Sequence, residues 1–175
     1  MSRRTVKRGI PVMNLCIRAA SAADLESILT IYNQGIADRI ATLESEEKDY
    51  TYIKKWFDEH QGRYAVLVAE MNGAVIGWAS LNRYSNRCAY DGVADLSIYI
   101  ERSYRGKGVG KVLLNRLEEV ARVQKFHKIV LFTFPFNGLG QGLYRKCGYR
   151  VVGVFHNQGI LDGNFVDVMA LEKIL

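Results

Sequence analysis

The chain has 175 residues, of which 49% are hydrophobic and 24% charged, and its formal net charge is +6. This length fits one domain with a sizeable core, and the balance excludes a disordered, compositionally biased chain. Since no apolar run approaches the roughly 20 residues of a membrane-spanning helix, we expect no membrane segment.

The positive charge is concentrated in residues 1–12, which contain four basic residues and no acidic one. Without these four charges the net charge falls from +6 to +2, which is too small for a nucleic-acid-binding face but suits an anionic ligand. The segment lacks the apolar core of a secretory signal. We interpret residues 1–12 as a disordered basic leader and residues 13–175 as a single domain.

The first part of this domain is predicted to contain a strand and two helices. Residues 15–18 are predicted to form a short strand, and Ser21 with Asp24 resembles a capping box at a helix start. Apolar residues at helical spacing extend this helix to about Asp38. A second helix is expected over residues 50–60.

Extended segments follow. Residues 64–71 and 74–81 flank Asn72-Gly73, the strongest short signal for a β-hairpin. Residues 93–100 form a third apolar, extended segment. The middle of the chain is therefore predicted to be an antiparallel part of a sheet.

Helices and strands then alternate. Residues 109–121 carry apolar residues on one helical face, residues 128–132 are predicted as a strand, and residues 139–146 as a short helix. Gly148 can cap that helix because glycine accepts a left-handed conformation.

Two final strands are expected over residues 149–155 and 165–171, with a hairpin across residues 161–164. The order of elements is β-α-α-β-β-β-α-β-α-β-β, which predicts a mixed α/β (α+β) layer fold.

A glycine-rich stretch, residues 105–110 (RGKGVG), lies between an expected strand and an expected helix. Its glycines leave room for main-chain N–H groups to converge, and the helix adds unpaired donors and the positive end of its dipole. The stretch is therefore predicted to bind a phosphate group. A tight turn whose glycines serve packing alone is the alternative.

Two common phosphate-binding motifs do not fit. A Walker loop requires glycine in place of Arg105 and a hydroxyl residue in place of Val112, and a dinucleotide fingerprint requires its third glycine one residue later. The remaining pattern, Arg-x-x-Gly-x-Gly after a strand, resembles the coenzyme A pyrophosphate loop of the GNAT (GCN5-related N-acetyltransferase) superfamily.

A second motif of that superfamily is similar to residues 137–149, where Asn137, Tyr144 and Tyr149 match. Gly140 and Gly142 depart from the pattern, because glycine inside a helix costs about 1 kcal/mol relative to alanine. The resemblance covers residues 15–175. It implies the GNAT fold, with a mixed, mostly antiparallel sheet of about seven strands and about four helices, and acetyl-CoA as co-substrate.

Within the superfamily the chain is similar to the phosphinothricin and methionine sulfoximine acetyltransferases. This similarity is carried by short stretches: Ile31-Tyr32-Asn33, Ala41-Thr42 with Glu44, Trp56-Phe57 with His60, Ala89-Tyr90 before Ala94-Asp95, and Asp162-Gly163 with Asp167. That family usually has Glu where this chain has Asp95. The similarity implies a small amino acid or analogue as acceptor, and a homodimer.

The resemblance also implies which residues hold the coenzyme. The glycine-rich turn binds the diphosphate mainly through main-chain N–H groups, and the strand before it pairs with the pantetheine arm. The residues are Ile98, Tyr99, Ile100, Arg105, Gly106, Lys107, Gly108, Val109, Gly110, Lys111, Asn137 and Tyr144. For Asn137 an N-cap of the short helix is a compatible alternative, and Lys107 and Lys111 equally suit solvated lysines.

Acetyl transfer from acetyl-CoA to an amine needs a general base and a hydrogen-bonding group near the thioester sulfur. Asp95 is the expected general base, acting through a water, and Tyr144 the expected partner of the departing thiolate. A carboxylate that only closes the strand and a half-buried aromatic residue are the alternatives. No histidine is spaced to activate Cys147, so direct attack on the thioester is favoured over an acyl-enzyme.

An amino-acid acceptor presents a carboxylate, which a guanidinium matches with two hydrogen bonds. Arg83 and Arg87, with Tyr84 and Tyr90, are the candidate acceptor-binding residues, and Arg39 is another. For each of the three arginines a solvated surface position is the alternative.

Other acceptors and roles remain open. A protein N-terminus, a polyamine or an aminoglycoside would use the same chemistry, and a non-catalytic acyl-CoA-binding module would use the coenzyme site alone. Three cysteines and three histidines lack metal-ligand spacing, which predicts reduced thiols in a cytoplasmic protein and no metal.

Overall fold

The computed structural model describes residues 14–60 and 62–175. Seven strands form one sheet in the order β1-β2-β3-β4-β5-β7-β6, in which only β4 and β5 are parallel neighbours. The strands are β1 Leu15–Ala19, β2 Val66–Met71, β3 Ala74–Arg83, β4 Val93–Ile100, β5 Lys128–Thr133, β6 Arg150–Leu161 and β7 Asn164–Ile174. The predicted mixed, mostly antiparallel sheet is confirmed.

Four α-helices are present in the described residues: α1 Leu25–Ala37, α2 Tyr50–Glu59, α3 Val109–Val123 and α4 Gly138–Lys146. The predicted order of strands and helices is confirmed. Among these residues no helix combines the length and apolarity needed to cross a membrane. The leader predicted over residues 1–12 lies outside the described residues.

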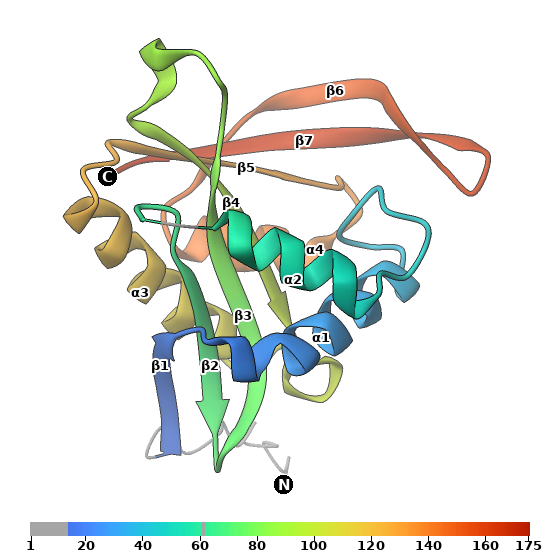
Figure 1. Cartoon of the computed structure of the whole chain (residues 1–175). Helices are drawn as coiled ribbons and strands as arrows, with labels where there is room; N and C mark the ends of the chain where they lie inside the picture. Colours follow the sequence, from blue (N-terminus) through green and yellow to red (C-terminus); the bar gives the residue numbers. More distant parts are fainter. Residues whose placement is uncertain (1–13, 61) are drawn as a thin grey trace, which may run out of the picture.

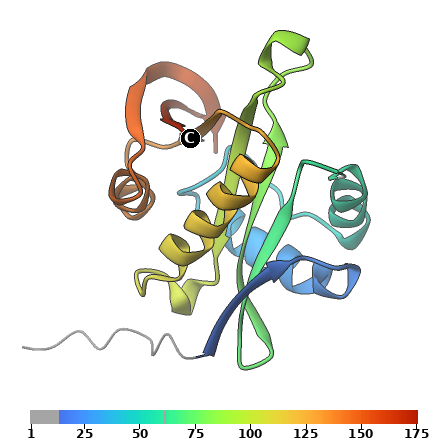
Figure 2. The ribbon, with the colours of Figure 1, turned by 90° about the vertical axis from the view of Figure 1, so that its left-hand side faces the viewer.

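The sheet is covered on both faces, with α1 and α2 on one side and α3 on the other (Figures 1 and 2). Strand β2 shows why residues 66–69 form an unbroken apolar run. Val66 and Val68 pack with Trp78 against α1 and α2, whereas Leu67 and Ala69 belong to the cluster around α3. Since neighbouring residues of a strand point to opposite faces, a strand buried on both faces needs apolar residues throughout.

The local signals in the sequence form as expected. Ser21 and Asp24 make the capping box before α1, and the hairpin turn places Asn72 and Gly73 at φ of 51° and 79°. Gly148 follows α4 with φ of 86°, the left-handed conformation of a helix C-cap. These signals were predictable because each depends on contacts within a few residues.

The prediction that the sixth strand ends at residue 155 was wrong, because β6 continues to Leu161 and pairs with β7 across a tight turn (Figure 1). The register shifts between Phe155 and Gly159, and Asn157 has a positive φ of 52°. The Asp167 carboxylate accepts hydrogen bonds at this irregularity, one of them from the Asn157 N–H at 2.8 Å. A bulge therefore lets β6 continue through the polar residues that interrupt its alternating pattern.

Strands β4 and β5 separate after three residue pairs. Val93, Ala94 and Asp95 pair with residues 128–130, and from Leu96 onward none of the described strands pairs with β4 on that side. On its other side β4 remains paired with β3 as far as Ile100. The separation exposes a main-chain edge in the middle of the sheet, and the candidate site lies along it.

Candidate active site

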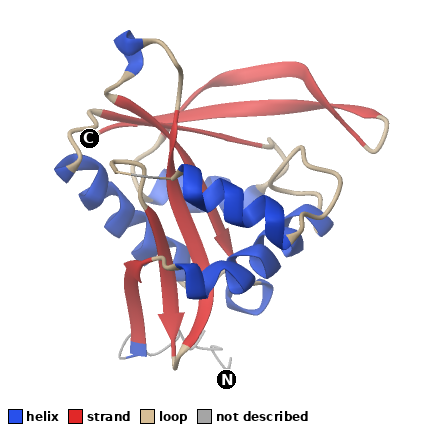
Figure 3. Cartoon of the chain, in the orientation of Figure 1, coloured by secondary structure: helices blue, strands red, loops and turns tan. Residues whose placement is uncertain are grey.

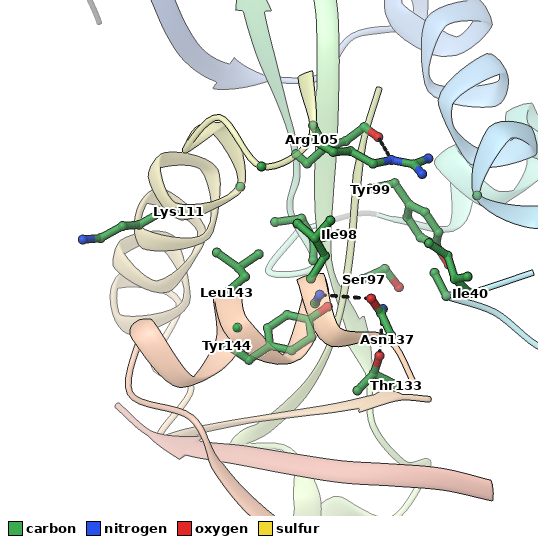
Figure 4. Close-up of a pocket in the computed structure, with 18 of the residues that line it drawn as sticks. Ile40, Ser97, Ile98, Tyr99, Arg105, Lys111, Thr133, Asn137, Leu143 and Tyr144 are labelled. Carbon is green, nitrogen blue, oxygen red and sulfur yellow. Dashed lines mark hydrogen bonds between the residues drawn. The ribbon is translucent and has the colours of Figure 1, made fainter. Parts of the chain in front are cut away.

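A cavity of ≈ 710 Å³ occupies the space where β4 and β5 separate. Residues 95–100 of β4 line one side, and α4, with the glycine-rich turn before α3, lines the other (Figure 4). The loop between α1 and α2, which Figure 3 shows without regular structure, contributes Ile40 and Ala41. The cavity therefore brings together segments from most of the chain.

The free edge of β4 presents main-chain groups to this cavity. The Glu101 N–H donates to Ile76 O of β3, so the alternation of an antiparallel ladder directs the main-chain groups of Ile98 and Ile100 away from β3. Consistently, Ile100 O accepts a hydrogen bond from Arg105 Nε at 3.0 Å rather than from β3. The Ile98 N–H is therefore free to bind an extended ligand.

The glycine-rich turn supplies a second set of main-chain donors. Gly106 and Gly108 have φ of 71° and 92°, which favour glycine, and Gly108 is the N-cap of α3 without a side-chain cap. Within the described residues, no acceptor is recorded for the N–H groups of residues 108–111. Converging N–H groups at a helix N-terminus suit a phosphate, so this turn fits the diphosphate of coenzyme A.

Arg105 lines the cavity but its guanidinium is engaged elsewhere. Its Nη1 contacts Asp38 Oδ2 at 2.5 Å, just beyond the end of α1, and its Nε donates to Ile100 O (Figure 4). Arg102 also pairs with Asp38, at 2.7 Å. Arg105 therefore fastens the turn to α1 and to the end of β4.

The other side chains of the turn contribute little to the cavity. Lys107 lies outside its lining, with Nζ 5.6 Å from the centre of the Tyr104 ring, and Val109 is buried in the core. Lys111 lines the cavity, but Figure 4 shows its amino group directed away from the other labelled residues. The turn thus offers main-chain groups rather than side-chain charge.

Asn137 and Tyr144 lie on opposite ends of α4 and both line the cavity. Asn137 Oδ1 accepts from the Gly140 N–H at 3.0 Å and its Nδ2 donates to Thr133 Oγ1 at 3.1 Å, so the N-cap role is confirmed. Tyr144 is 8% exposed, and burial, with a smaller contribution from the Asp95 charge, raises its pKa well above the usual value. Its hydroxyl therefore keeps its proton at neutral pH.

Asp95 is the last residue of β4 that pairs with β5. Burial raises the pKa of its carboxyl group to about 6, against the opposing effect of hydrogen bonds from the Asn82 side chain and the Leu96 main chain. Asn82 Nδ2 donates to Asp95 Oδ2 at 3.1 Å. A carboxylate with this pKa is largely ionised at neutral pH and is a stronger base than a solvated one.

A second cavity of ≈ 480 Å³ adjoins the first at Asp95 and Phe132, which line both. The four predicted acceptor-binding residues, Arg83, Tyr84, Arg87 and Tyr90, line this second cavity together. The fifth candidate, Arg39, lines neither cavity and pairs with Asp162 at 2.9 Å. Asp95 therefore lies where the larger cavity and the cavity that contains Arg83 and Arg87 meet.

Cys147 lines neither cavity, and burial raises the pKa of its thiol. Among the described residues no three His, Cys, Asp or Glu side chains are grouped as metal ligands.

Two residues at the site were not predicted from the sequence: Asn82, which donates a hydrogen bond to Asp95, and Thr133, which accepts one from Asn137. The register of β3 against β4 would have placed Asn82 opposite Asp95, but no sequence signal fixes that register.

Comparison of the chain with known protein families, relatives and solved structures agrees with this geometry. Residues 26–149 match the model of the acetyltransferase (GNAT) family. The chain is 33% identical to the L-methionine sulfoximine/L-methionine sulfone acetyltransferase of Pseudomonas aeruginosa, over 91% of this chain and 94% of that protein.

Two solved structures have the same fold. A GNAT superfamily phosphinothricin acetyltransferase from Sinorhizobium meliloti, in complex with acetyl-CoA, has a TM-score of 0.87 and 30% identity over 93% of this chain and 89% of its own. A ribosomal-protein-alanine N-acetyltransferase from Brucella melitensis has a TM-score of 0.88 and 30% identity over 91% and 99%.

The fold and the family match define an acyltransferase, and the main-chain donors of the larger cavity suit its coenzyme. The chain belongs to the GNAT acetyltransferase family, and its co-substrate is acetyl-CoA.

Proposed function

We propose that this enzyme transfers the acetyl group of acetyl-CoA to the primary amine of a small amino acid or amino-acid analogue of the phosphinothricin or methionine sulfoximine type. The observation that carries this proposal is the position of Asp95, which lines both the coenzyme cavity and the cavity of Arg83 and Arg87. An amine in the second cavity, with its carboxylate at the arginines, would lie beside both the base and the coenzyme cavity. The names of the relatives support the same acceptor class.

The proposed chemistry divides between three groups of the chain. Acetyl-CoA, when bound, supplies a thioester carbon open to direct attack by an amine. Asp95 accepts a proton from the ammonium group of the acceptor, directly or through a water. The Ile98 N–H is available to a developing oxyanion, and such a donor contributes about 3–4 kcal/mol. The Tyr144 hydroxyl donates to the departing sulfur.

One general base can supply much of the free energy needed to deprotonate the acceptor amine. An amine with a pKa near 9–10 is mostly protonated at neutral pH, so freeing it costs about 3–4 kcal/mol at ~1.36 kcal/mol per pKa unit. A carboxylate whose pKa burial has raised to about 6 recovers part of that cost. Burial at the junction thus turns an ordinary aspartate into a suitable proton acceptor.

The acceptor class is tested by incubating the protein with acetyl-CoA and a panel of amines while a thiol reagent detects released coenzyme. We expect release above hydrolysis with methionine sulfoximine or phosphinothricin, and none with their decarboxylated analogues. Absence of release with both amino-acid analogues would refute the acceptor class.

A protein N-terminus is the second candidate acceptor, because one of the structural neighbours is a ribosomal-protein-alanine N-acetyltransferase. A peptide N-terminus carries no neighbouring carboxylate, so it gives Arg83 and Arg87 nothing to bind in two-point fashion. Faster release with an alanine-initiated peptide than with the free amino-acid analogues would favour this candidate.

We also propose a homodimer. Large apolar side chains lie exposed along the β6–β7 hairpin, among them Phe155 at 50%, Ile160 at 62% and Phe165 at 67%. An exposed apolar surface of this kind suits association between copies of the chain. Light scattering is expected to give twice the monomer mass, and a monomer at micromolar concentration would contradict the proposal. The cytoplasmic location remains a prediction.

A further inference from the structure

The mechanism above leaves one ordered polar cluster unused. His60, the C-cap residue of α2, lies behind the Asp95 carboxylate on the far side of Asn82. Its Nδ1 is 2.7 Å from Trp56 O and its Nε2 is 2.8 Å from Asn82 Oδ1. A continuous chain of hydrogen-bonding groups thus runs from the end of a helix to the candidate base.

Asn82 occupies the centre of this chain. Its Nδ2 lies 3.1 Å from Asp95 Oδ2 and 2.9 Å from Ser97 Oγ, while its Oδ1 also accepts from Ser80 Oγ at 2.8 Å. Asn82 is the cross-strand partner of Asp95, and Ser80 is the partner of Ser97. The sheet itself therefore places the amide between the ring and the carboxylate.

The chemistry of an amide fixes the direction of these bonds. An ionised carboxylate only accepts, so the NH₂ group of Asn82 must face Asp95, which turns the amide oxygen toward His60. An amide oxygen only accepts, so Nε2 of the His60 ring carries the hydrogen in its bond to Asn82 Oδ1 in this arrangement. The reverse amide orientation fits a proton on Asp95 and a bare Nε2.

The surroundings hold His60 and Asn82 in place. The His60 ring lies 4.3 Å from the Trp56 ring, centre to centre, and Ser80 is fully buried. Such packing limits the freedom of the ring and the amide to find other partners. Neither side chain lines the two cavities, so they are available for support rather than for contact with substrate.

We propose that His60 and Asn82 are positioning residues for Asp95: the His60 Nε2–H holds the Asn82 oxygen, so that the amide NH₂ faces Asp95 and keeps its carboxylate ionised and directed at the junction of the two cavities. The inference rests on the proposed role of Asp95 as general base. It assigns His60 an effect on proton transfer from beyond the substrate cavities.

Other charged or titratable groups also face Asp95. Arg83 and Arg87 share its second cavity, and the hydroxyls of Tyr99 and Tyr144 are near enough for its charge to raise their pKa values. Among the described side chains, however, Asn82 is the one recorded in a hydrogen bond to the carboxylate. Within the same residues no acidic or basic side chain is hydrogen-bonded to the His60 ring.

The first test compares His60→Ala with His60→Gln, since a glutamine amide can still donate to Asn82 but cannot titrate. For His60→Ala we expect the acid limb of kcat against pH to move up by about one pH unit, which lowers kcat about tenfold below the limb, with an unchanged KM for acetyl-CoA. His60→Gln is expected to recover most of this loss. His156→Ala is the matched control, because His156 is exposed and pairs with Asp167 outside both cavities.

An acid limb in His60→Ala at the wild-type position would overturn the proposal. An equal loss in both His60 variants without any change of the pH profile would also overturn it, because that result indicates a structural role.

The second test needs no acceptor and therefore separates this inference from the proposed function. The Nε2–H signal of His60 is recorded by ¹H–¹⁵N NMR at one pH in the wild type and in Asp95→Asn, with His60→Gln assigning the signal. The carboxylate fixes the orientation of the Asn82 amide, so in Asp95→Asn the Nε2–H signal is expected to shift or to be lost by exchange with water. An unchanged signal would overturn the positioning role even if the enzyme acetylates the expected acceptors. Wild-type protein that releases no coenzyme with any amine would refute the proposed function, while the NMR comparison would still test the positioning role.

Discussion

The two cavities that meet at Asp95 present different kinds of chemical group to a ligand. The larger one presents the free edge of β4 and the N–H groups of the turn before α3, whose lysines contribute little to it. The smaller one presents side chains: two arginines and two tyrosines, with Phe132 and Asp95 at the junction. A main-chain site is specified by conformation, whereas a side-chain site is specified by residue identity. We therefore expect the first to be sensitive to backbone changes and the second to single side-chain changes.

The largest expected effect comes from Asp95→Asn, which removes the proposed base at the junction and leaves the main-chain donors of the larger cavity unchanged. General base catalysis contributes about 10²–10⁴-fold, so we expect kcat to fall by at least a hundredfold. Calorimetry should give an unchanged affinity for acetyl-CoA. A loss of coenzyme binding as large as the loss of turnover would show that the two cavities are not separable.

The next largest effect is expected for Arg83→Ala and Arg87→Ala. A charged hydrogen bond contributes about 1.5–3 kcal/mol, so loss of the arginine that binds the acceptor carboxylate should raise the acceptor KM about 10–100-fold. The KM for acetyl-CoA should not change. Arg39→Ala is the matched control because Arg39 pairs with Asp162 outside both cavities. Wild-type kinetics in both variants would contradict a carboxylate-binding role for the second cavity.

The pH dependence follows from the Asp95 carboxyl group, whose pKa burial raises to about 6. The ionised form is the proposed base, so kcat/KM should be constant above this pH and fall about tenfold per pH unit below it. The profile is measured with acetyl-CoA saturating, and Asp95→Asn should lack this limb. A limb that persists in that variant would assign it to another group.

A smaller effect is expected for Gly108→Ala, which tests whether the larger cavity depends on the backbone conformation of the glycine-rich turn. An added Cβ would meet no atom within 4 Å, but φ is 92° there, so the cost is in the backbone. A left-handed conformation costs a residue with a Cβ about 1–2 kcal/mol, and we expect lower thermal stability or a several-fold higher KM for acetyl-CoA. Wild-type values of both would show that the turn does not depend on this conformation.

The smallest effect is expected for Lys107→Ala and Lys111→Ala. Exposed charges contribute about 0.2–1 kcal/mol, so the KM for acetyl-CoA should rise less than about fivefold at physiological salt. A tenfold or greater increase would mean that side-chain charge, not main-chain donors, holds the diphosphate.

Prediction from the sequence succeeded where a signal is local or forms part of a long motif. The turn at Asn72-Gly73, the capping box at Ser21 and the N-cap at Asn137 all form as expected. The gathering of Arg83 and Tyr90 in one cavity was expected from the chemistry of an amino-acid acceptor and from their place before Asp95, while Arg39 and its pairing with Asp162 needed the tertiary structure. The length of β6 was mispredicted because a bulge, held by Asp167, carries the strand through polar residues.

The order of strands and helices and the glycine-rich turn were determined by the sequence alone, because periodicity and backbone freedom act over a few residues. Tertiary structure decided where β4 and β5 separate, which arginines share a cavity with Asp95, and that His60 stands behind Asn82. These relations depend on strand register and on helix packing between residues far apart in the chain. Burial at the junction of the two cavities raises the pKa of Asp95, a property that its residue type alone does not give.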